Sequence, residues 1–178
     1  RIAENYFSML DDLLIATRLP VFSKHAKRKL VQHAKFFYFD VGVFRAIRPV
    51  GPLDSPAEID GPGLETLVLQ ELRAVNDNEE LGYELFFWRT KHGLEVDFVL
   101  YGQRGLLAIE VKRSTTLHSQ ELRALREFKG DYPLARCFVF YGGSTPIYLG
   151  DVIAVPMAHA LANLKSILDG TWVPPKPE

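Results

Sequence analysis

Residues 95–114 read EVDFVLYGQRGLLAIEVKRS, and this stretch decides the fold of the chain. Residues 95–101 and 106–112 consist mostly of apolar side chains, among them the β-branched or aromatic residues that favour β-strands. The sequence GQRG between them predicts a tight turn with Gln103 and Arg104 at its tip. We therefore expect a β-hairpin.

A two-residue turn fixes which side chains of the hairpin face one another. The resulting register brings Asp97 opposite Glu110. It also brings Glu95 opposite Lys112, as in an ordinary cross-strand ion pair. Because side chains alternate between the two faces of a strand, these four lie on one face. The residues expected on the opposite face are all apolar: Val96, Phe98, Leu100, Leu107, Ile109 and Val111.

The charged face is polar only at the end far from the turn. Nearer the turn it carries Val99, Tyr101, Leu106 and Ala108. We therefore expect a sheet covered on both sides, with a polar site at one end. A bulged turn would shift the register by one residue and place the two opposed acids on different faces.

Opposed carboxylates need a positive charge between them. Like charges directly across a sheet are destabilising, and burial strengthens the repulsion between Asp97 and Glu110. A divalent metal such as Mg²⁺, which prefers carboxylate oxygens, would relieve it. Lys112 projects to the same side and could orient a water or stabilise a phosphate, so the three residues suit metal-assisted phosphodiester hydrolysis. The alternative is that Lys112 alone neutralises both acids.

Composition limits the protein class. The chain has 178 residues, is 47% hydrophobic and carries a formal net charge of −1, which neither requires nor excludes nucleic acid. The single cysteine, Cys137, lies in an apolar run, which favours a buried thiol in a reducing compartment. The sequence shows no apolar run of the roughly 18–20 residues that a membrane helix needs and no signal peptide. We therefore expect a cytoplasmic protein without membrane contact.

The N-terminal part, residues 1–50, is predicted to be a helical region. Tyr6 to Leu14 carries an amphipathic stripe, in a helix expected to end at Pro20. Arg18 to Lys35 holds six Lys or Arg and no acid, so it could contact phosphates or be a solvated surface. The Pro- and Gly-rich residues 49–63 predict a loop at the domain boundary.

The main domain is predicted to span residues 62–170. A helix should start with Pro62 in its first turn and end near Asn76. The segments expected to follow are strands at 83–89, 95–101 and 106–112, a helix at 118–129, a strand at 135–141, a strand pair within 147–156 and a helix at 157–168. The core order is helix, three strands, helix, strand, an α/β arrangement.

Glu65 is a further candidate for the site. It stands at the N-terminal end of a helical stripe that faces the core, so it could join the site or only complement the helix dipole. Arg89 and Lys91 could contact phosphates, although surface charge explains Lys91 equally well. His92 fits a turn, since the sequence shows no second histidine at metal-ligand spacing.

These residues resemble the PD-(D/E)xK nuclease superfamily: Glu65 on a first helix, Asp97 on a second strand and Glu110-Val111-Lys112 on a third. More narrowly, four segments in order are similar to a prokaryotic C-terminal module, domain of unknown function 4143, that follows an AAA+ ATPase domain. The segments are KFFYFDVGVFRAI, GLETLVLQEL, FFWRTKHGLEVDFVL and LLAIEVKRS. The resemblance runs from about Ile2 to Leu168.

The resemblance implies a restriction-endonuclease-like core with a small helical, winged-helix-like N-terminal extension. It implies Mg²⁺ or Mn²⁺ ligands at Asp97 and Glu110, with the Val111 carbonyl as an additional ligand. Glu65 would be an outer ligand or would position a water, and Lys112 would orient the attacking water. No proline precedes Asp97, a departure that many members of the superfamily share.

The function implied is a Mg²⁺-dependent endonuclease or exonuclease, a hydrolase acting on DNA. The alternative is a non-catalytic regulatory, nucleic-acid-binding or protein-interaction module. Either would work with an ATPase domain of the same polypeptide, and ATP would bind only there, upstream of Arg1. The sequence is compatible with an oligomer.

Overall fold

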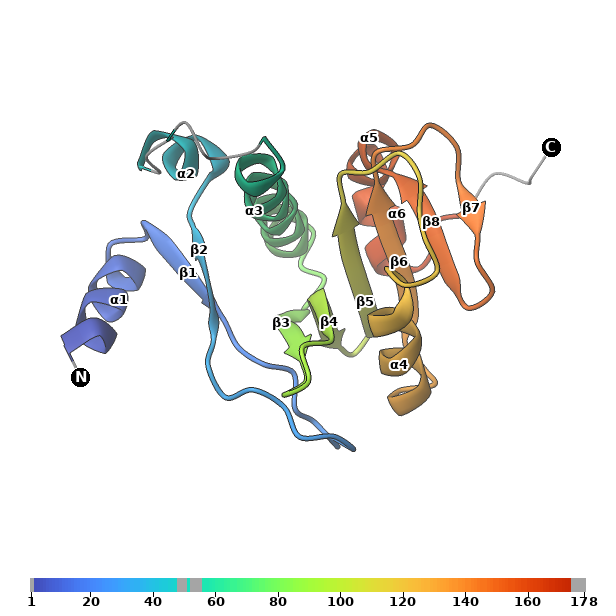
Figure 1. The fold of residues 1–178 in the computed structure, drawn as a ribbon, viewed down its shortest axis with the longest axis horizontal. Helices are drawn as coiled ribbons and strands as arrows, with labels where there is room; N and C mark the ends of the chain where they lie inside the picture. The colour runs from blue at the N-terminus through green and yellow to red at the C-terminus, as the bar shows by residue number, and fades with distance from the viewer. Residues whose placement is uncertain (1, 48–50, 52–55, 174–178) are drawn as a thin grey trace.

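A six-stranded mixed sheet forms the centre of the computed structural model, which describes residues 2–47, 51 and 56–173. Its strand order is β3-β4-β5-β6-β8-β7, antiparallel from β3 to β5 and parallel from β5 to β8 (Figure 1). The strands are β3 (Glu84–Arg89), β4 (Glu95–Gly102), β5 (Gly105–Lys112), β6 (Arg136–Tyr141), β7 (Ile147–Tyr148) and β8 (Val152–Pro156). β7 and β8 form the strand pair predicted within residues 147–156, and they run antiparallel.

Helices cover both faces of this sheet. The helices are α3 (Pro56–Asn78), α4 (Arg123–Asp131), α5 (Met157–Ala162) and α6 (Leu164–Asp169). One apolar cluster joins α3 and α6 to Phe98, Leu107 and Ile109 of the sheet. A second joins α4 to Val99 and Ala108 on the opposite face. The order α3, three strands, α4, β6 agrees with the predicted helix, three strands, helix, strand.

Three apolar side chains of residues 118–129, the segment predicted to be a helix, pack on the α4 face of the sheet. Leu122, Leu125 and Phe128 are all buried. Cys137 is a buried free thiol, also as predicted, and burial raises its pKa to about 11. It therefore packs as a small apolar residue rather than acting as a nucleophile.

The predicted boundaries of three helices were wrong. α3 begins at Pro56 rather than Pro62, so part of the expected boundary loop is helical, while residues 48–50 and 52–55 lie outside the described residues. Pro62 sits inside this helix, and its missing N–H costs one helical hydrogen bond. α4 begins at Arg123, after a turn, and the predicted helix 157–168 is divided at Asn163 into α5 and α6.

The N-terminal part contains a two-stranded sheet where helix was predicted. α1 (Ile2–Asp12) and α2 (Val41–Ile47) flank β1 (Ala16–Leu19) and β2 (Lys35–Tyr38), which pair antiparallel. α1 ends at Asp12 rather than continuing to Pro20. Leu14 adopts a positive φ of 57°, and pairing with the aromatic β2 buries Ala16 and Leu19. Tertiary pairing has therefore overridden the helical periodicity.

Residues 20–34, which we call the strap, connect β1 to β2 along the outer edge of the main sheet. Phe22 N–H donates to the Phe87 carbonyl at 2.7 Å, and Phe87 N–H donates to the Pro20 carbonyl at 3.0 Å. Further along, Val31 N–H donates to the carbonyl of Arg89 at 3.1 Å. Figure 1 shows the strap passing below β3 and β4. It thereby covers an otherwise open strand edge and fixes where β2 begins.

No described helix combines the length and the apolar character needed to cross a membrane.

Candidate functional site

The register of the β4–β5 hairpin confirms the prediction from its turn. Gly102 pairs with Gly105, and the ladder continues to Phe98 and Ile109. Gly105 has a φ of +121°, a conformation that suits glycine. Both strands are buried through their middle and less so at their ends. The polar residues are therefore held at the end far from the turn.

The two strands depart from a regular ladder at that end. Asp97 Oδ2 accepts a hydrogen bond from Val111 N–H at 2.9 Å, so a side chain rather than backbone binds this donor. The register of β3 with β4 shifts between Phe86 and Trp88. Val96 packs in the α4-side cluster with Val99, whereas strict alternation predicted the other face. The break in alternation corrects that prediction and marks the position of Asp97.

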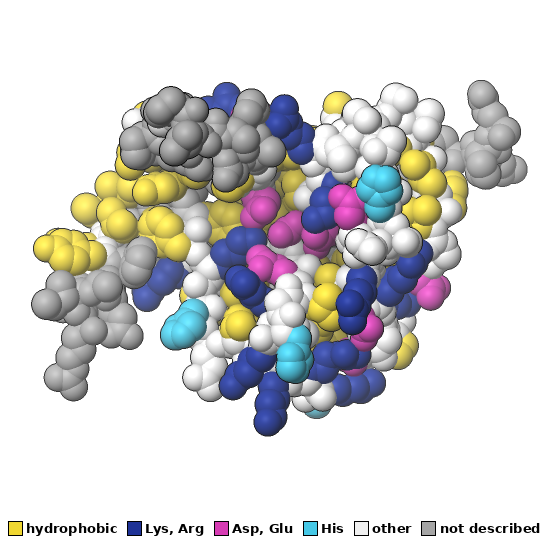
Figure 2. Space-filling view, viewed as in Figure 1, with side chains coloured by type: hydrophobic (Ala, Val, Ile, Leu, Met, Phe, Trp, Pro, Cys, Tyr) yellow, Lys and Arg dark blue, Asp and Glu magenta, His cyan; other side chains and the backbone are white. Residues whose placement is uncertain are grey.

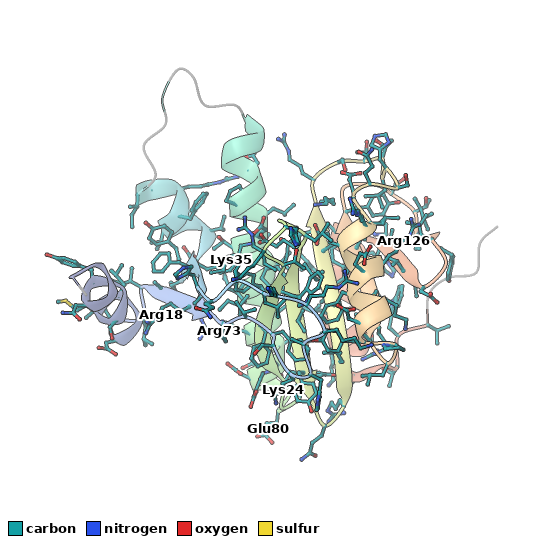
Figure 3. All side chains as sticks on the ribbon, turned by 60° about the horizontal axis from the view of Figure 1, so that its bottom comes forward. Arg18, Lys24, Lys35, Arg73, Glu80 and Arg126 are labelled. Atoms are coloured by element: carbon teal, nitrogen blue, oxygen red, sulfur yellow. The ribbon has the colours of Figure 1, made fainter. Side chains whose placement is uncertain are left out.

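Lys35, the first residue of β2, joins three acids that lie far apart in sequence. Its Nζ is 2.8 Å from Glu65 Oε2, 2.7 Å from Glu95 Oε1 and 3.5 Å from Asp97 Oδ1. Figure 3 labels Lys35 beside α3 and the strands of the main sheet. In the sequence, Lys35 stands out only as one of several basic residues between positions 18 and 35. Its place at the start of an aromatic strand was the available signal.

Glu65 lies where its helical stripe predicted, on α3 and half-buried beside the sheet. The predicted pairing of Glu95 with Lys112, by contrast, is not formed. Glu95 instead pairs with Lys35 and, through Oε2, with Arg89 Nη1 at 3.3 Å. The predicted register holds from the turn to Phe98 and Ile109, and at Glu95 both cations come from outside the hairpin.

Glu110 and Lys112 form the second half of the site. Lys112 Nζ lies 2.6 Å from Glu110 Oε1. The other oxygen, Glu110 Oε2, is buried and has no hydrogen-bond partner. Leu106 and Ala108 face α4, so alternation along β5 places Glu110 and Lys112 on that side too. An unpaired buried acceptor is costly and needs an explanation.

The raised pKa values of two acids indicate that the cations at this end of the sheet do not neutralise them. Burial, reinforced by the charge of Glu65, raises the pKa of Asp97 to about 6, although Lys35 and Val111 N–H oppose the rise. Burial, reinforced by the charge of Asp97, raises the pKa of Glu110 to about 8, against the opposing effect of Lys112. Asp97 and Glu110 thus repel one another, as their predicted opposition implied. Lys112 does not offset both acids.

Burial alone would lower the pKa of Lys35, but the charges of Asp97, Glu65 and Glu95 outweigh it and raise that pKa. The charge of Glu110 likewise outweighs burial at Lys112 and raises the pKa of that lysine. Both lysines therefore carry a full charge at neutral pH.

Among the described side chains, no group of three His, Cys, Asp or Glu stands arranged to hold a metal ion. The donors near one another are Glu65, Glu95, Asp97 and Glu110, and the ammonium of Lys35 occupies the space between the first three. Carboxylates are nonetheless the donors that Mg²⁺ and Mn²⁺ prefer. The unpaired Glu110 Oε2 is an acceptor that such a cation would satisfy. The donor set therefore fits a hard divalent cation, after local rearrangement.

A basic surface lies beside the acids. One cavity between the strap and α4 is lined by Lys29, His92 and Arg123, among others. The adjoining cavity shares Arg123 and adds Arg126. Figure 2 shows Lys and Arg side chains around and below a group of acidic ones. Lys91 and His92 are exposed and so available for contact, whereas Arg89 is engaged with Glu95.

Comparison with known proteins places the chain in a family context. Residues 60–160 match the model of a family described as a domain of unknown function (DUF4143). Uncharacterized proteins of Mycobacterium tuberculosis and Mycobacterium bovis are each 30% identical over 167 residues, which is 90% of this chain and 36% of each relative. The chain thus spans about a third of the length of these relatives. No solved structure matches it.

Proposed function

Because the chain belongs to the DUF4143 family, whose description assigns no activity, its function must be inferred from the site, and we propose a nuclease-like domain that hydrolyses phosphodiester bonds in DNA with a divalent metal. The observation that carries the proposal is the burial of Asp97 and Glu110, two acids that repel one another, with Glu110 Oε2 unpaired and Lys112 beside it. Two buried acids that repel one another destabilise the fold, so a purely structural role does not explain why both are present in a covered sheet.

The roles follow from the positions of the side chains. Asp97 and Glu110 would hold Mg²⁺ or Mn²⁺, with Glu65 as an outer ligand and the Val111 carbonyl beside them. When bound, the metal would polarise a phosphoryl oxygen and lower the pKa of a water. Lys112, charged and next to Glu110, is suited to orient the attacking water or to bind a phosphate oxygen. Asp97 holds Val111 N–H and thereby keeps β5 in place.

The fold supports the same proposal. The order of α3, the β3–β5 meander, α4 and β6 agrees with the restriction-endonuclease-like core that the resemblance implies. The match covers only 36% of each mycobacterial relative, which leaves room in those proteins for a further domain. We propose an AAA+ ATPase domain as that partner in the full protein.

The basic surface favours a nucleic acid as substrate. Among the described residues, Lys29, Arg123 and Arg126 have no carboxylate partner for their side chains, and they line neighbouring cavities. Cations without acidic partners are free to bind phosphates, and such contacts dominate affinity for DNA. This surface lies on the same side of the sheet as Glu110 and Lys112.

A second candidate function rests on Lys35. Its ammonium already contacts Glu65, Glu95 and Asp97, so these acids are partly neutralised by the chain itself. That contact favours a non-catalytic module that binds DNA or its ATPase through the basic surface.

Cleavage assays separate the two candidates. Plasmid, linear duplex and single-stranded DNA would be incubated with the purified chain in Mg²⁺ and in Mn²⁺. The nuclease proposal expects cleavage that falls by about 10²- to 10³-fold in Lys112→Ala. Lys165→Ala, which removes a lysine of α6 paired with Glu79, is the matched control and should cleave normally. Equal cleavage by wild type and Lys112→Ala, or none by any form, would favour the binding module.

A further inference from the structure

We propose that Lys35 is a built-in counter-ion of the site and that a divalent cation binds Glu65, Glu95 and Asp97 in exchange for its ammonium. This inference rests on the proposed function, because the cation is the one that the nuclease would use. It also adds Glu95 to the metal-binding residues and makes β2, which lies outside the matched residues 60–160, a regulator of the site.

The geometry around Lys35 Nζ is that of a cation position. Oxygens of three carboxylates from α3 and β4 converge on one nitrogen, at 2.7 to 3.5 Å. Mg²⁺ needs oxygens at about 2.0–2.1 Å, so the carboxylates would have to close in around a smaller ion. The side chains of Glu65 and Glu95 are 24% and 25% exposed, so an ion can reach them from solvent.

Charge balance favours exchange over joint occupancy. With all four ionised, as metal binding requires, the carboxylates of Glu65, Glu95, Asp97 and Glu110 face three cations, Lys35, Arg89 and Lys112, which leaves one formal negative charge. A divalent ion in place of Lys35 would bring the formal charge to zero. The same ion added beside Lys35 would leave an excess positive charge at a partly buried site, which is costly.

Independently of this charge balance, one buried carboxylate oxygen of the site has no partner although Lys35 is present. Glu110 Oε2 is buried and unpaired, its side chain is only 7% exposed, and the charge of Asp97 acts on it directly. An ammonium contacting Asp97 at 3.5 Å leaves this oxygen without a partner. A divalent cation that takes the place of this ammonium on Asp97 and also contacts Glu110 Oε2 would supply one.

The rest of the N-terminal part holds Lys35 in place. Lys35 pairs with Leu19 in the β1–β2 ladder, and the strap that precedes it is bonded to β3. The flexible four-carbon side chain can nevertheless withdraw its ammonium without moving the backbone. Any movement of the strap would change the same contact, so the N-terminal part can set the affinity of the site for metal.

Titration with Mn²⁺ tests the exchange, with isothermal calorimetry as the readout and no DNA present. Lys35→Met removes the competing ammonium and should bind Mn²⁺ about tenfold more tightly than wild type, a coupling of ordinary size. Lys35→Arg keeps the positive charge, and its guanidinium can bind two carboxylate oxygens at once. This variant should therefore bind Mn²⁺ more weakly than wild type. Lys24→Met, a strap lysine paired with Glu84, is the matched control and should bind as wild type does.

Glu95→Gln in the Lys35→Met background should weaken Mn²⁺ binding again. Equal affinity in wild type, Lys35→Met and Lys35→Arg, with binding lost in Asp97→Asn, would overturn the exchange while leaving the proposed metal site intact. No binding in any form would overturn both. Tighter binding in Lys35→Met without cleavage of any DNA would support the exchange and refute the nuclease.

Discussion

Arg28 and Lys35 both reach from the N-terminal part to acids of the main domain, but they contact those acids differently. Arg28 Nη2 lies 2.7 Å from Glu127 Oε2, and its Nε lies 2.6 Å from Asp131 Oδ2. Each acid therefore has its own guanidinium nitrogen. Lys35 offers one nitrogen to three carboxylates, of which Asp97 is 3.5 Å away.

The difference is the one expected between a contact that only stabilises the fold and a site that binds a ligand. The planar fork of Arg28 matches two carboxylates and fastens the strap to α4. Beside Lys35, by contrast, an acceptor stays unpaired, and two acids have raised pKa values. Repulsion of this kind is retained in binding sites because a ligand relieves it. A change at Lys35 should therefore respond to a divalent cation, and a change at Arg28 should not.

The largest expected effect is on stability as a function of pH in the absence of divalent metal. Asp97 and Glu110 have folded-state pKa values of about 6 and about 8. Both exceed the ordinary values near 4, so between about pH 4 and 8 the folded state binds more protons than the unfolded state. The free energy of unfolding should fall across this window, on the order of a few kcal/mol.

Urea unfolding at several pH values measures this decline. The double variant Asp97→Asn, Glu110→Gln should flatten it, because neither group then ionises. Glu127→Gln removes an acid on the Arg28 side and should leave the decline unchanged. Mn²⁺ should also reduce the decline in the wild type. A wild-type stability that rises from pH 5 to 8 would contradict the repulsion.

The next largest effect comes from comparing Arg28 with Lys35 directly. Arg28→Met leaves the buried Asp131 without its cation and should lower the free energy of unfolding by about 1–2 kcal/mol. Lys35→Met should lower it by a similar amount at pH 8. Added Mn²⁺ should restore the Lys35→Met variant and not the Arg28→Met variant. Equal responses to Mn²⁺ would show that the two sites are alike.

Contacts between residues close in sequence could be predicted, whereas contacts between residues far apart in sequence could not. The β4–β5 register follows from a two-residue turn and from alternation, so the closeness of Asp97 and Glu110 was predictable. Glu65 was placed by the periodicity of its own helix. The register shift at Phe86 and Trp88, which sends Val96 to the α4 side, has no local sequence signal.

Lys35 could not be assigned because its contacts are set by tertiary structure. Its Nζ donates a hydrogen bond to Glu95, which lies 60 positions away in the sequence. The strap that positions Lys35 is held by backbone hydrogen bonds to β3. Because these are backbone hydrogen bonds, the side chains of the strap do not reveal them in the sequence. The same limit explains β1, where Ala16 to Leu19 continued a helical pattern but found a strand partner in β2.

The smallest expected effect concerns cations without acidic partners. Among the described residues, Arg126 pairs with no carboxylate, whereas Arg28 pairs with two. If Arg126 contacts a DNA phosphate, Arg126→Gln should weaken binding a few-fold and make the slope of log K against log salt less steep by about 0.9. Fluorescence anisotropy with a labelled duplex, in EDTA to prevent cleavage, measures both.

Arg104→Gln removes the same charge at the hairpin turn and should leave the slope unchanged, because that end of the sheet lies far from the acids. Equal slopes for wild type and Arg126→Gln would instead make Arg126 an ordinary solvated side chain, and the path of DNA would then have to run over Lys29 and Lys91.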